Sequence, residues 1–172
     1  MENVLRTERL LLRPLGPGDL EAVAAYATDP ENARLMVFFP HEDAAETAAF
    51  LSSAAAEWQK ESPAFLEFAI LEEGALIGNI GLYFPEEGCG EFSWLLRRDR
   101  WGRGYAPEAA RALLDFGRER LGLTRFLAQC DAANAASIRV AEGLGLRLTG
   151  RGTRRNRLSP EERPELIYEL RL

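Results

Sequence analysis

The chain has 172 residues, a length that fits one domain able to bury its own core. Its 47% hydrophobic and 28% charged residues exclude a disordered chain, and no apolar run is long enough to cross a bilayer. The 27 acidic residues outnumber the 21 basic ones, and the resulting net charge of −6 disfavours general nucleic-acid binding. The N-terminus carries early acidic residues and no apolar signal-peptide block, so we expect a cytosolic protein. Cys89 and Cys130 form no spacing motif, which predicts neither a disulfide framework nor a metal site.

Arginines gather in two stretches of this acidic chain. Residues 97–103 contain four arginines and one aspartate, and residues 147–157 contain five arginines and no acid. Such clusters are typical of sites for small anionic groups. Arginine is also the default cation of this sequence, in which Lys60 is the only lysine, so both interpretations stay open. The second cluster has no interleaved aromatic residues, which argues against single-stranded nucleic acid as its partner.

Hydrophobic periodicity and turn residues predict the elements in chain order. Asp43 and Glu46 resemble a capping box at the start of the second helix, and Gly78 and Gly81 inside one strand predict a bulge or a close backbone neighbour. The arginine-rich stretch is expected to be a loop. The order predicts an α+β fold, a single domain over residues 1–172 with one mixed, mostly antiparallel sheet flanked by helices. The predicted elements are strand 7–14, helices 19–28 and 44–60, strands 65–71, 75–84 and 91–96, helix 106–121, strand 124–130, helix 134–142, and strands 144–148 and 165–170.

The most informative segment is residues 91–112, where a buried strand ends in a turn with Gly102 and Gly104 and a helix starts at once. Glycines let the backbone approach a ligand closely, and the unpaired N–H groups of a helix N-terminus favour a phosphate. The turn lacks the Gly-Lys-Ser/Thr of a P-loop and the G-x-G-x-x-G of a dinucleotide site. It therefore indicates a phosphate-bearing ligand of another kind, although ordinary tight turns also contain such glycines.

This turn resembles the acetyl-CoA signature of the GNAT superfamily of N-acetyltransferases, Gln/Arg-x-x-Gly-x-Gly/Ala, at Gly104 and Ala106. Trp101 replaces the first signature residue, and Trp-Gly-x-Gly-Tyr-Ala is how the ribosomal-protein acetyltransferase (RimJ/RimL-like) branch usually writes this turn. Leu146 stands where that branch often has Phe. The resemblance spans nearly the whole chain in the right order. Three further segments are similar to the branch: residues 7–13, 76–82 and 134–145.

The resemblance implies an acyl-CoA N-acyltransferase fold with acetyl-CoA as co-substrate. Backbone groups of Leu95 and Leu96 would meet the pantetheine arm, with a donor near Leu95 for the oxyanion. Backbone amides of the glycine turn would hold the pyrophosphate, and its arginines would meet phosphate charge. Asn134 would cap its helix and also contact the pantetheine arm. The expected cofactor-binding residues are Leu95, Leu96, Trp101, Gly102, Arg103, Gly104, Tyr105, Ala106 and Asn134.

Acetyl transfer to an amine needs a base, because a free amine is mostly protonated at neutral pH. Glu91, at the start of the strand beside the cofactor, is the expected base; a solvated strand-edge role is the alternative, and Glu67 is the second choice. Ser137 occupies the serine position of the resembling branch and would protonate the departing thiolate. The alternative for Ser137 is a first-turn residue behind an Asn N-cap. His41, the lone histidine, is expected to be solvated.

The sequence thus predicts an acetyl-CoA-dependent N-acetyltransferase. Its acceptor is a protein N-terminal α-amine, as the branch resemblance implies, or a small amine such as an antibiotic, a polyamine or an amino acid. A non-catalytic acyl-CoA-binding module is the alternative outside this class, and Asn134, Ser137 and Glu91 favour the enzyme. We expect a monomer or homodimer with no nucleic-acid or membrane partner.

Overall fold

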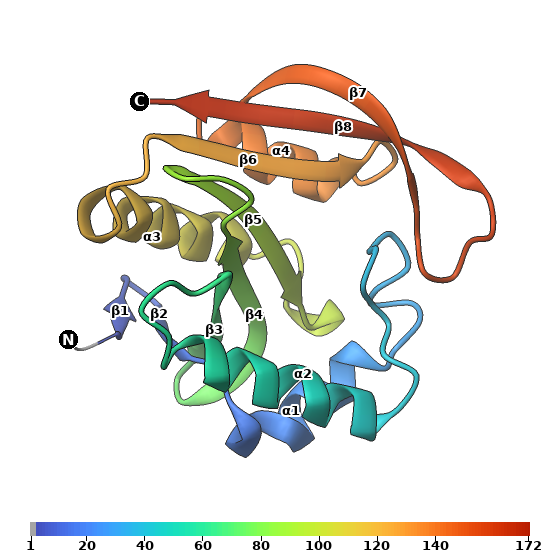
Figure 1. Cartoon of the computed structure of the whole chain (residues 1–172). Coiled ribbons are helices and arrows are strands. Elements are labelled where there is room, and N and C mark those ends of the chain that lie inside the picture. The colour runs from blue at the N-terminus through green and yellow to red at the C-terminus, as the bar shows by residue number, and fades with distance from the viewer. Residues whose placement is uncertain (1–2) are drawn as a thin grey trace.

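Figure 1 shows the computed structural model of the chain, which describes residues 3–172. One eight-stranded sheet has the order β1-β2-β3-β4-β5-β6-β8-β7. The helices are α1 (Leu20–Ala27), α2 (Ala44–Glu57), α3 (Tyr105–Arg120) and α4 (Ala135–Gly143), and two 3₁₀ turns, η1 (Pro17–Asp19) and η2 (Arg98–Arg100), precede α1 and α3. The strands are β1 (Leu5–Arg6), β2 (Leu10–Pro14), β3 (Phe65–Glu72), β4 (Ala75–Tyr83), β5 (Cys89–Leu96), β6 (Arg125–Asp131), β7 (Arg147–Arg155) and β8 (Glu162–Arg171).

The sheet is mixed because the connection between β5 and β6 crosses over. β5 leads through α3 into β6, which pairs with β5 in parallel, while the other neighbouring pairs among the described strands are antiparallel. A parallel pair needs such a crossover, whereas antiparallel neighbours can be joined by tight turns. The prediction of a mixed, mostly antiparallel sheet flanked by helices is confirmed. None of the helices in the described part of the chain is long and apolar enough to span a membrane.

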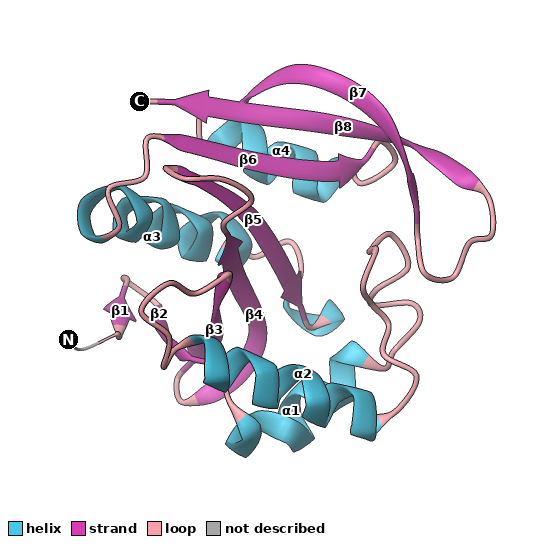
Figure 2. Ribbon diagram, in the orientation of Figure 1, coloured by secondary structure: helices cyan, strands magenta, loops and turns pink. Residues whose placement is uncertain are grey.

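Two hydrophobic cores lie on opposite faces of the sheet, and Figure 2 shows the helices that cover them. Alternate residues of β3 enter different cores, Phe68 with α3 and Ala69 with α1 and α2. This explains why β3 is a continuous apolar run, since successive side chains of a strand point to opposite faces. Leu113 of α3 and Leu51 of α2 are both fully buried. The two covered faces hold the sheet rigidly around the divergence of β5 and β6.

The strand ends differ from prediction in two places. The predicted strand 7–14 begins only at Leu10, because a turn at Thr7, whose N–H donates to the Leu10 carbonyl at 3.0 Å, separates β2 from the short strand β1, which lies before the predicted range. The arginine-rich stretch predicted as a loop is β7 itself, and the predicted strand 144–148 extends to Arg155. β7 is the edge strand and is mostly exposed, so it has no apolar alternation to reveal it. Charged side chains on an edge strand also prevent pairing with other chains.

Gly78 has the close backbone neighbour that the sequence predicted, whereas the close neighbour of Gly81 is a side chain. A Cβ added at Gly78 would lie 2.4 Å from the Leu95 carbonyl oxygen, and one at Gly81 would lie 2.5 Å from Oε1 of Glu67. The predicted bulge also lies in β4, because Ile70 pairs with Gly78 and Leu71 with Leu76, which leaves Ile77 of that strand as the extra residue. Both glycines are therefore required by packing, and Gly81 makes room for a buried carboxyl group.

Candidate active site

A gap opens in the sheet where β5 and β6 diverge. The two strands pair only over residues 89–91 and 125–127, although β5 continues to Leu96 and β6 to Asp131. Backbone groups beyond this point lose a strand partner while lying inside the fold, and buried backbone groups need hydrogen bonds. The gap is therefore a place where an extended ligand can complete the hydrogen bonding of β5.

The hydrogen-bond alternation of β5 decides which of its backbone groups face this gap. The Arg97 N–H, just past the end of β5, donates to the Ile77 carbonyl of β4 at 2.8 Å. Alternate residues of an antiparallel strand bond to the same neighbour, so Leu95 also faces β4. Trp94 and Leu96 therefore direct their backbone groups toward the gap.

Part of this edge is already occupied. The Leu96 carbonyl accepts hydrogen bonds from Asn32 Nδ2 at 2.9 Å and from Trp101 Nε1 at 3.1 Å. The Trp101 side chain is half exposed and covers the end of β5 beside the glycine turn. The groups still open at the gap are the amide and carbonyl of Trp94 and the amide of Leu96.

The glycine turn ends at the N-terminus of α3 with its backbone amides uncapped. Gly104, the N-cap residue, has φ 78°, and no side chain among residues 3–172 caps the helix. Gly102 also has a positive φ of 72°, and a Cβ there would meet no described atom within 4 Å. Two left-handed residues in a turn favour glycine, and unpaired N–H groups at a helix N-terminus attract anions. The turn therefore offers free backbone amides to an anionic group.

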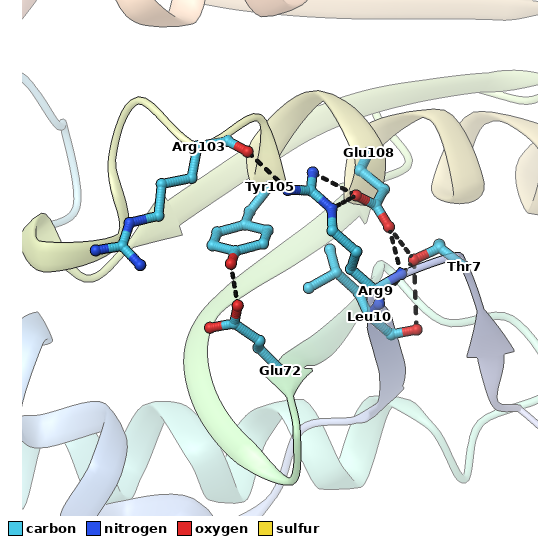
Figure 3. A network of polar contacts seen from close by, with 7 residues as sticks. All are labelled: Thr7, Arg9, Leu10, Glu72, Arg103, Tyr105 and Glu108. Carbon is cyan, nitrogen blue, oxygen red and sulfur yellow. Dashed lines mark hydrogen bonds and ion pairs between the residues drawn. The ribbon is translucent and has the colours of Figure 1, made fainter.

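A network of polar contacts holds the glycine turn in place, as Figure 3 shows. Arg9 Nη1 donates to the Arg103 carbonyl at 2.9 Å, and Arg9 Nε donates to Oε2 of Glu108 at 2.7 Å. The Arg9 guanidinium also lies 4.6 Å from the centre of the Tyr105 ring, whose hydroxyl donates to Glu72. The resembling segment 7–13 therefore supports the turn through Arg9, while exposed Arg103 remains on the solvent side.

A cavity of about 860 Å³ extends through the gap and joins both faces of the sheet. Ser137 and Trp94 line it together with Glu91, so two of the expected catalytic groups meet in one space. Its other walls include apolar residues of the loop between α1 and α2, among them Met36 and Phe38. Arg154, Arg155 and Arg157 of the second arginine cluster also line this cavity.

Ser137 is held at the cavity by two neighbours. Its backbone N–H donates to Oδ1 of Asn134 at 3.1 Å, so Asn134 is the N-cap of α4. Trp94 Nε1 donates to Oγ of Ser137 at 3.1 Å. Within residues 3–172 the Ser137 hydroxyl donates to no protein acceptor, so its hydrogen is available to a group in the cavity.

Glu91 is half buried in the cavity wall beside an acid and a cation. Burial raises the pKa of the Glu91 carboxyl, and the charge of Glu165 raises it further. A hydrogen bond from Gln129 and the charge of Arg154 lower the pKa in part. A carboxylate with a raised pKa at a cavity surface is suited to accept a proton.

Glu67, the second choice for a base, lies behind the cavity wall. It is fully buried, and its carboxyl accepts from Asn79 Nδ2 at 3.1 Å and from the Tyr83 hydroxyl at 2.9 Å. Tyr83 lines the cavity and separates Glu67 from it. Burial raises the pKa of Glu67 to about 7, although these two hydrogen bonds oppose the shift.

Asp131 and His41 complete the polar lining. Asp131 ends β6 and accepts from Arg163 Nε at 2.6 Å, from Asn156 Nδ2 at 2.7 Å and from the Ala133 N–H at 2.9 Å. These bonds fix the loop that leads to Asn134. His41 corrects the sequence prediction: it is buried, not solvated, and its Nδ1 lies 2.8 Å from Oγ1 of Thr47. Burial lowers the pKa of His41.

These features match a known family. Residues 9–147 match the family described as acetyltransferase (GNAT) domain. The chain belongs to the GNAT family. This GNAT protein is therefore an acetyl-CoA-dependent N-acetyltransferase with the acyl-CoA N-acyltransferase fold. The fold and the co-substrate predicted from the sequence are confirmed, and the acyl-CoA-binding module without activity is not supported.

Individual relatives agree with the family. The GNAT protein is 32% identical over 149 residues to the uncharacterized N-acetyltransferase YnaD of Bacillus subtilis, covering 85% of this chain and 84% of YnaD. An acetyltransferase structure from Agrobacterium tumefaciens has 31% identity and a TM-score of 0.76, with 98% of this chain and 94% of that chain covered. RimL, a ribosomal L7/L12 α-N-protein acetyltransferase in complex with coenzyme A, has a TM-score of 0.88 at 16% identity over 98% of both chains, which shows a shared fold alone.

Sequence reasoning missed Trp94, Tyr83 and Asp131 as parts of the site. Trp94 belongs to no motif that marks a site, and its indole contact spans 43 positions of sequence. Tyr83 lies at the end of a predicted strand, where a partly exposed tyrosine is unremarkable. Only the register of the sheet brings these side chains to the cavity, so no local pattern could identify them.

Proposed function

We propose that this GNAT protein transfers the acetyl group of acetyl-CoA to a primary amine, and that the acceptor is a protein N-terminal α-amine. The observation that carries the proposal is the meeting of Ser137 and Glu91 in the cavity that passes through the gap between β5 and β6. The Trp-Gly-x-Gly-Tyr-Ala turn supports the N-terminal acceptor, because this form of the turn is typical of the RimJ/RimL-like branch.

The cofactor-binding residues follow from the same geometry. The amides of Tyr105 and Ala106 face the pyrophosphate, with Gly102 and Gly104 giving access and Arg103 on the solvent side. Backbone groups of Trp94 and Leu96 at the edge of β5 bind the pantetheine arm, so the contacts expected near Leu95 pass to its neighbours. The bound group supplies an activated acetyl thioester.

Each residue around the gap then has a separate role in the reaction. Glu91 accepts a proton from the acceptor ammonium and leaves a nucleophilic amine. An N–H of β5 at Trp94 or Leu96 donates to the oxyanion that develops when the amine attacks. Ser137 donates its free hydroxyl hydrogen to the departing sulfur. Asn134 holds Ser137 by capping its helix and lines the cavity near the pantetheine arm.

A small-molecule amine is the second acceptor class, and one observation favours it. The Arg157 N–H donates to the Met36 carbonyl at 3.3 Å, and its Nη1 lies 2.5 Å from Oε1 of Glu46. These bonds tie the β7–β8 connection to the loop before α2 and to α2 itself, the segments that face each other in Figure 1. Met36, Glu46 and Arg157 all line the cavity, and a cavity wall held together by such bonds suits a compact acceptor.

One assay tests the function and separates the two acceptor classes. Free thiol released from acetyl-CoA is measured with a panel of peptides that have free N-termini, matched peptides with blocked N-termini, and small amines. The proposal predicts thiol release with free N-termini and none with the blocked peptides. If only small amines were acetylated, the acceptor would be a small molecule and not a protein N-terminus. If no amine were acetylated, the proposed function would be contradicted.

A further inference from the structure

We propose that Tyr83 and Glu67 form a proton relay in which the Tyr83 hydroxyl takes a proton from the acceptor nitrogen and passes its own proton to Glu67. The inference rests on the proposed function and adds a second proton acceptor to it. Its basis is geometric: the Tyr83 hydroxyl contacts Oε1 of Glu67 at 2.9 Å, while Tyr83 itself lines the acetyl-transfer cavity.

Glu67 has the surroundings of a functional carboxyl. It is 1% exposed and makes no ion pair with any described residue. A buried carboxylate without a cation is costly, and such a group is expected to be functional more often than structural. The chain makes room for it, because a Cβ at Gly81 would lie 2.5 Å from its Oε1.

The second carboxyl oxygen of Glu67 is fixed by a hydrogen-bonded chain that leads away from the cavity. Asn79 Nδ2 donates to Oε2 of Glu67 at 3.1 Å, and the Tyr26 hydroxyl of α1 donates to Oδ1 of Asn79 at 2.8 Å. Oε1 of Glu67 therefore faces only the Tyr83 hydroxyl among the described side chains. The carboxyl is aimed at one proton donor, and that donor belongs to a residue that lines the cavity.

Tyr83 is next to the expected base. The register pairs Tyr83 of β4 with Glu91 of β5, so both side chains lie on the same face of the sheet and line the same cavity. The Tyr83 ring is also stacked on Phe65, with ring centres 5.0 Å apart, which fixes its direction. An acceptor nitrogen that reaches Glu91 is therefore in the neighbourhood of the Tyr83 hydroxyl.

The reaction requires two proton acceptors. As the C–N bond forms and the C–S bond breaks, the nitrogen loses two protons between ammonium and amide, and the sulfur gains one. Glu91 takes the first proton from nitrogen, and Tyr83 takes the second while its own proton moves to Glu67. Ser137 protonates the sulfur and recovers a proton from solvent. Glu91 and Glu67 then release theirs, so one proton leaves for each acetyl group transferred.

The electrostatics agree with these roles. Burial and the adjacent Glu67 raise the pKa of Tyr83, so the phenol passes a proton on and does not ionise. The titratable groups that face the pair are Tyr26 of α1, through Asn79, and Glu91 of β5. With burial raising its pKa to about 7, Glu67 is ionised and ready to accept a proton above that pH, and kcat should fall below it.

The test compares Tyr83→Phe, Glu67→Gln and the double variant with a matched control, Tyr26→Phe. The control removes a buried hydroxyl from the same hydrogen-bonded chain but leaves the Glu67–Tyr83 contact intact. We measure kcat against pH, acetyl-CoA affinity by calorimetry and unfolding by denaturant for each protein. In each relay variant kcat should fall by about 10²-fold. The decrease of kcat that the wild type shows below the pKa of Glu67 should also be absent from the pH profile of each relay variant. The double variant should be no slower than the singles, because both remove one relay.

Tyr26→Phe should lose stability and keep the kcat and pH profile of the wild type. The relay is overturned if Tyr83→Phe keeps the wild-type kcat and profile, if the two single losses multiply in the double variant, or if Tyr26→Phe reproduces the profile of Tyr83→Phe. A wild type that acetylates no amine overturns the proposed function as well. If the wild type acetylates amines and the relay variants have the same kcat and pH profile as the wild type, the relay alone is overturned.

Discussion

Trp94 Nε1 donates a hydrogen bond of 3.1 Å to Oγ of Ser137, across the gap in the sheet where the acetyl thioester is expected. An indole N–H is only a donor, so this contact uses a lone pair of the serine oxygen and leaves the hydroxyl hydrogen free. A donor on the oxygen also stabilises the alkoxide that forms when the proton leaves. This arrangement supports the proposed role of Ser137 as the acid.

Ser137→Ala tests this acid directly. Removing the hydroxyl should lower kcat by about 10²-fold, at the low end of general-acid effects, because the thiolate must then leave without a positioned proton. Acetyl-CoA affinity, measured by calorimetry, should stay near the wild-type value, since the backbone sites remain. Full activity in the variant would return Ser137 to the status of a helix-start residue.

Trp94→Phe tests the positioning of Ser137. Phenylalanine keeps much of the packing against Phe92 but has no N–H to donate. We expect kcat to fall by about fivefold, less than in Ser137→Ala, because one neutral hydrogen bond contributes about 1 kcal/mol. In the Ser137→Ala background the same substitution should have little further effect. An equal loss in both backgrounds would show that Trp94 does not act through Ser137.

Gly104→Asp tests the phosphate site at the start of α3. The aspartate adds a side chain and a negative charge where the pyrophosphate approaches, and should weaken acetyl-CoA binding more than tenfold, or more than about 1.4 kcal/mol. Gly122→Asp is the matched control, because Gly122 also has a positive φ of 67° and lies beyond the other end of α3. If the two folded variants bound acetyl-CoA with equal affinity in calorimetry, the start of α3 would not be the phosphate site.

The fold could be predicted where the buried side chains form a recognisable pattern in the sequence. β3 and β4 are buried on both faces and show as apolar runs, and α3 carries a clear apolar face. β7 was missed because an exposed edge strand has neither pattern. The glycine turn was found from local chemistry, whereas the contacts of Trp94 and Tyr83 depend on the sheet register. His41 was misjudged because its burial arises from tertiary packing between Phe39 and Phe50.

Asp131 should make the stability of the fold depend on acid pH. Burial alone would raise the pKa of Asp131, but hydrogen bonds from Arg163, Ala133 and Asn156 outweigh it and lower the pKa to about 2. A depressed carboxyl pKa stabilises the folded state above the unfolded pKa, and this contribution is lost as the pH falls through about 2. Near neutral pH the contribution is about 2 kcal/mol.

The measurement is denaturant unfolding of the wild type and Asp131→Asn across the acid range. Asparagine keeps the shape and removes the charge, so the variant should be less stable near neutral pH, and the two curves should approach each other as the pH falls. If the difference in unfolding free energy between the two proteins stayed constant with pH, the charge of Asp131 would not contribute to stability.

Glu91→Gln tests the expected base. Glutamine keeps the size of the side chain but cannot accept the acceptor's proton, so the rate near neutral pH should fall. The loss should be smaller at high pH, where more of the amine is already neutral. Because burial and Glu165 raise the pKa of Glu91, the wild-type rate should rise with pH through a value above that of an ordinary glutamate. A profile parallel to the wild type in Glu91→Gln would show that Glu91 is not the base.

The central claim is that the gap between β5 and β6 brings the thioester to Ser137. A crystal structure of the protein with coenzyme A measures this most directly. We predict the pyrophosphate on the amides of Tyr105 and Ala106, the pantetheine arm along Trp94 and Leu96, and the sulfur within roughly 3.5 Å of Oγ of Ser137. Coenzyme A bound with its sulfur outside the gap, away from Ser137, would contradict the account.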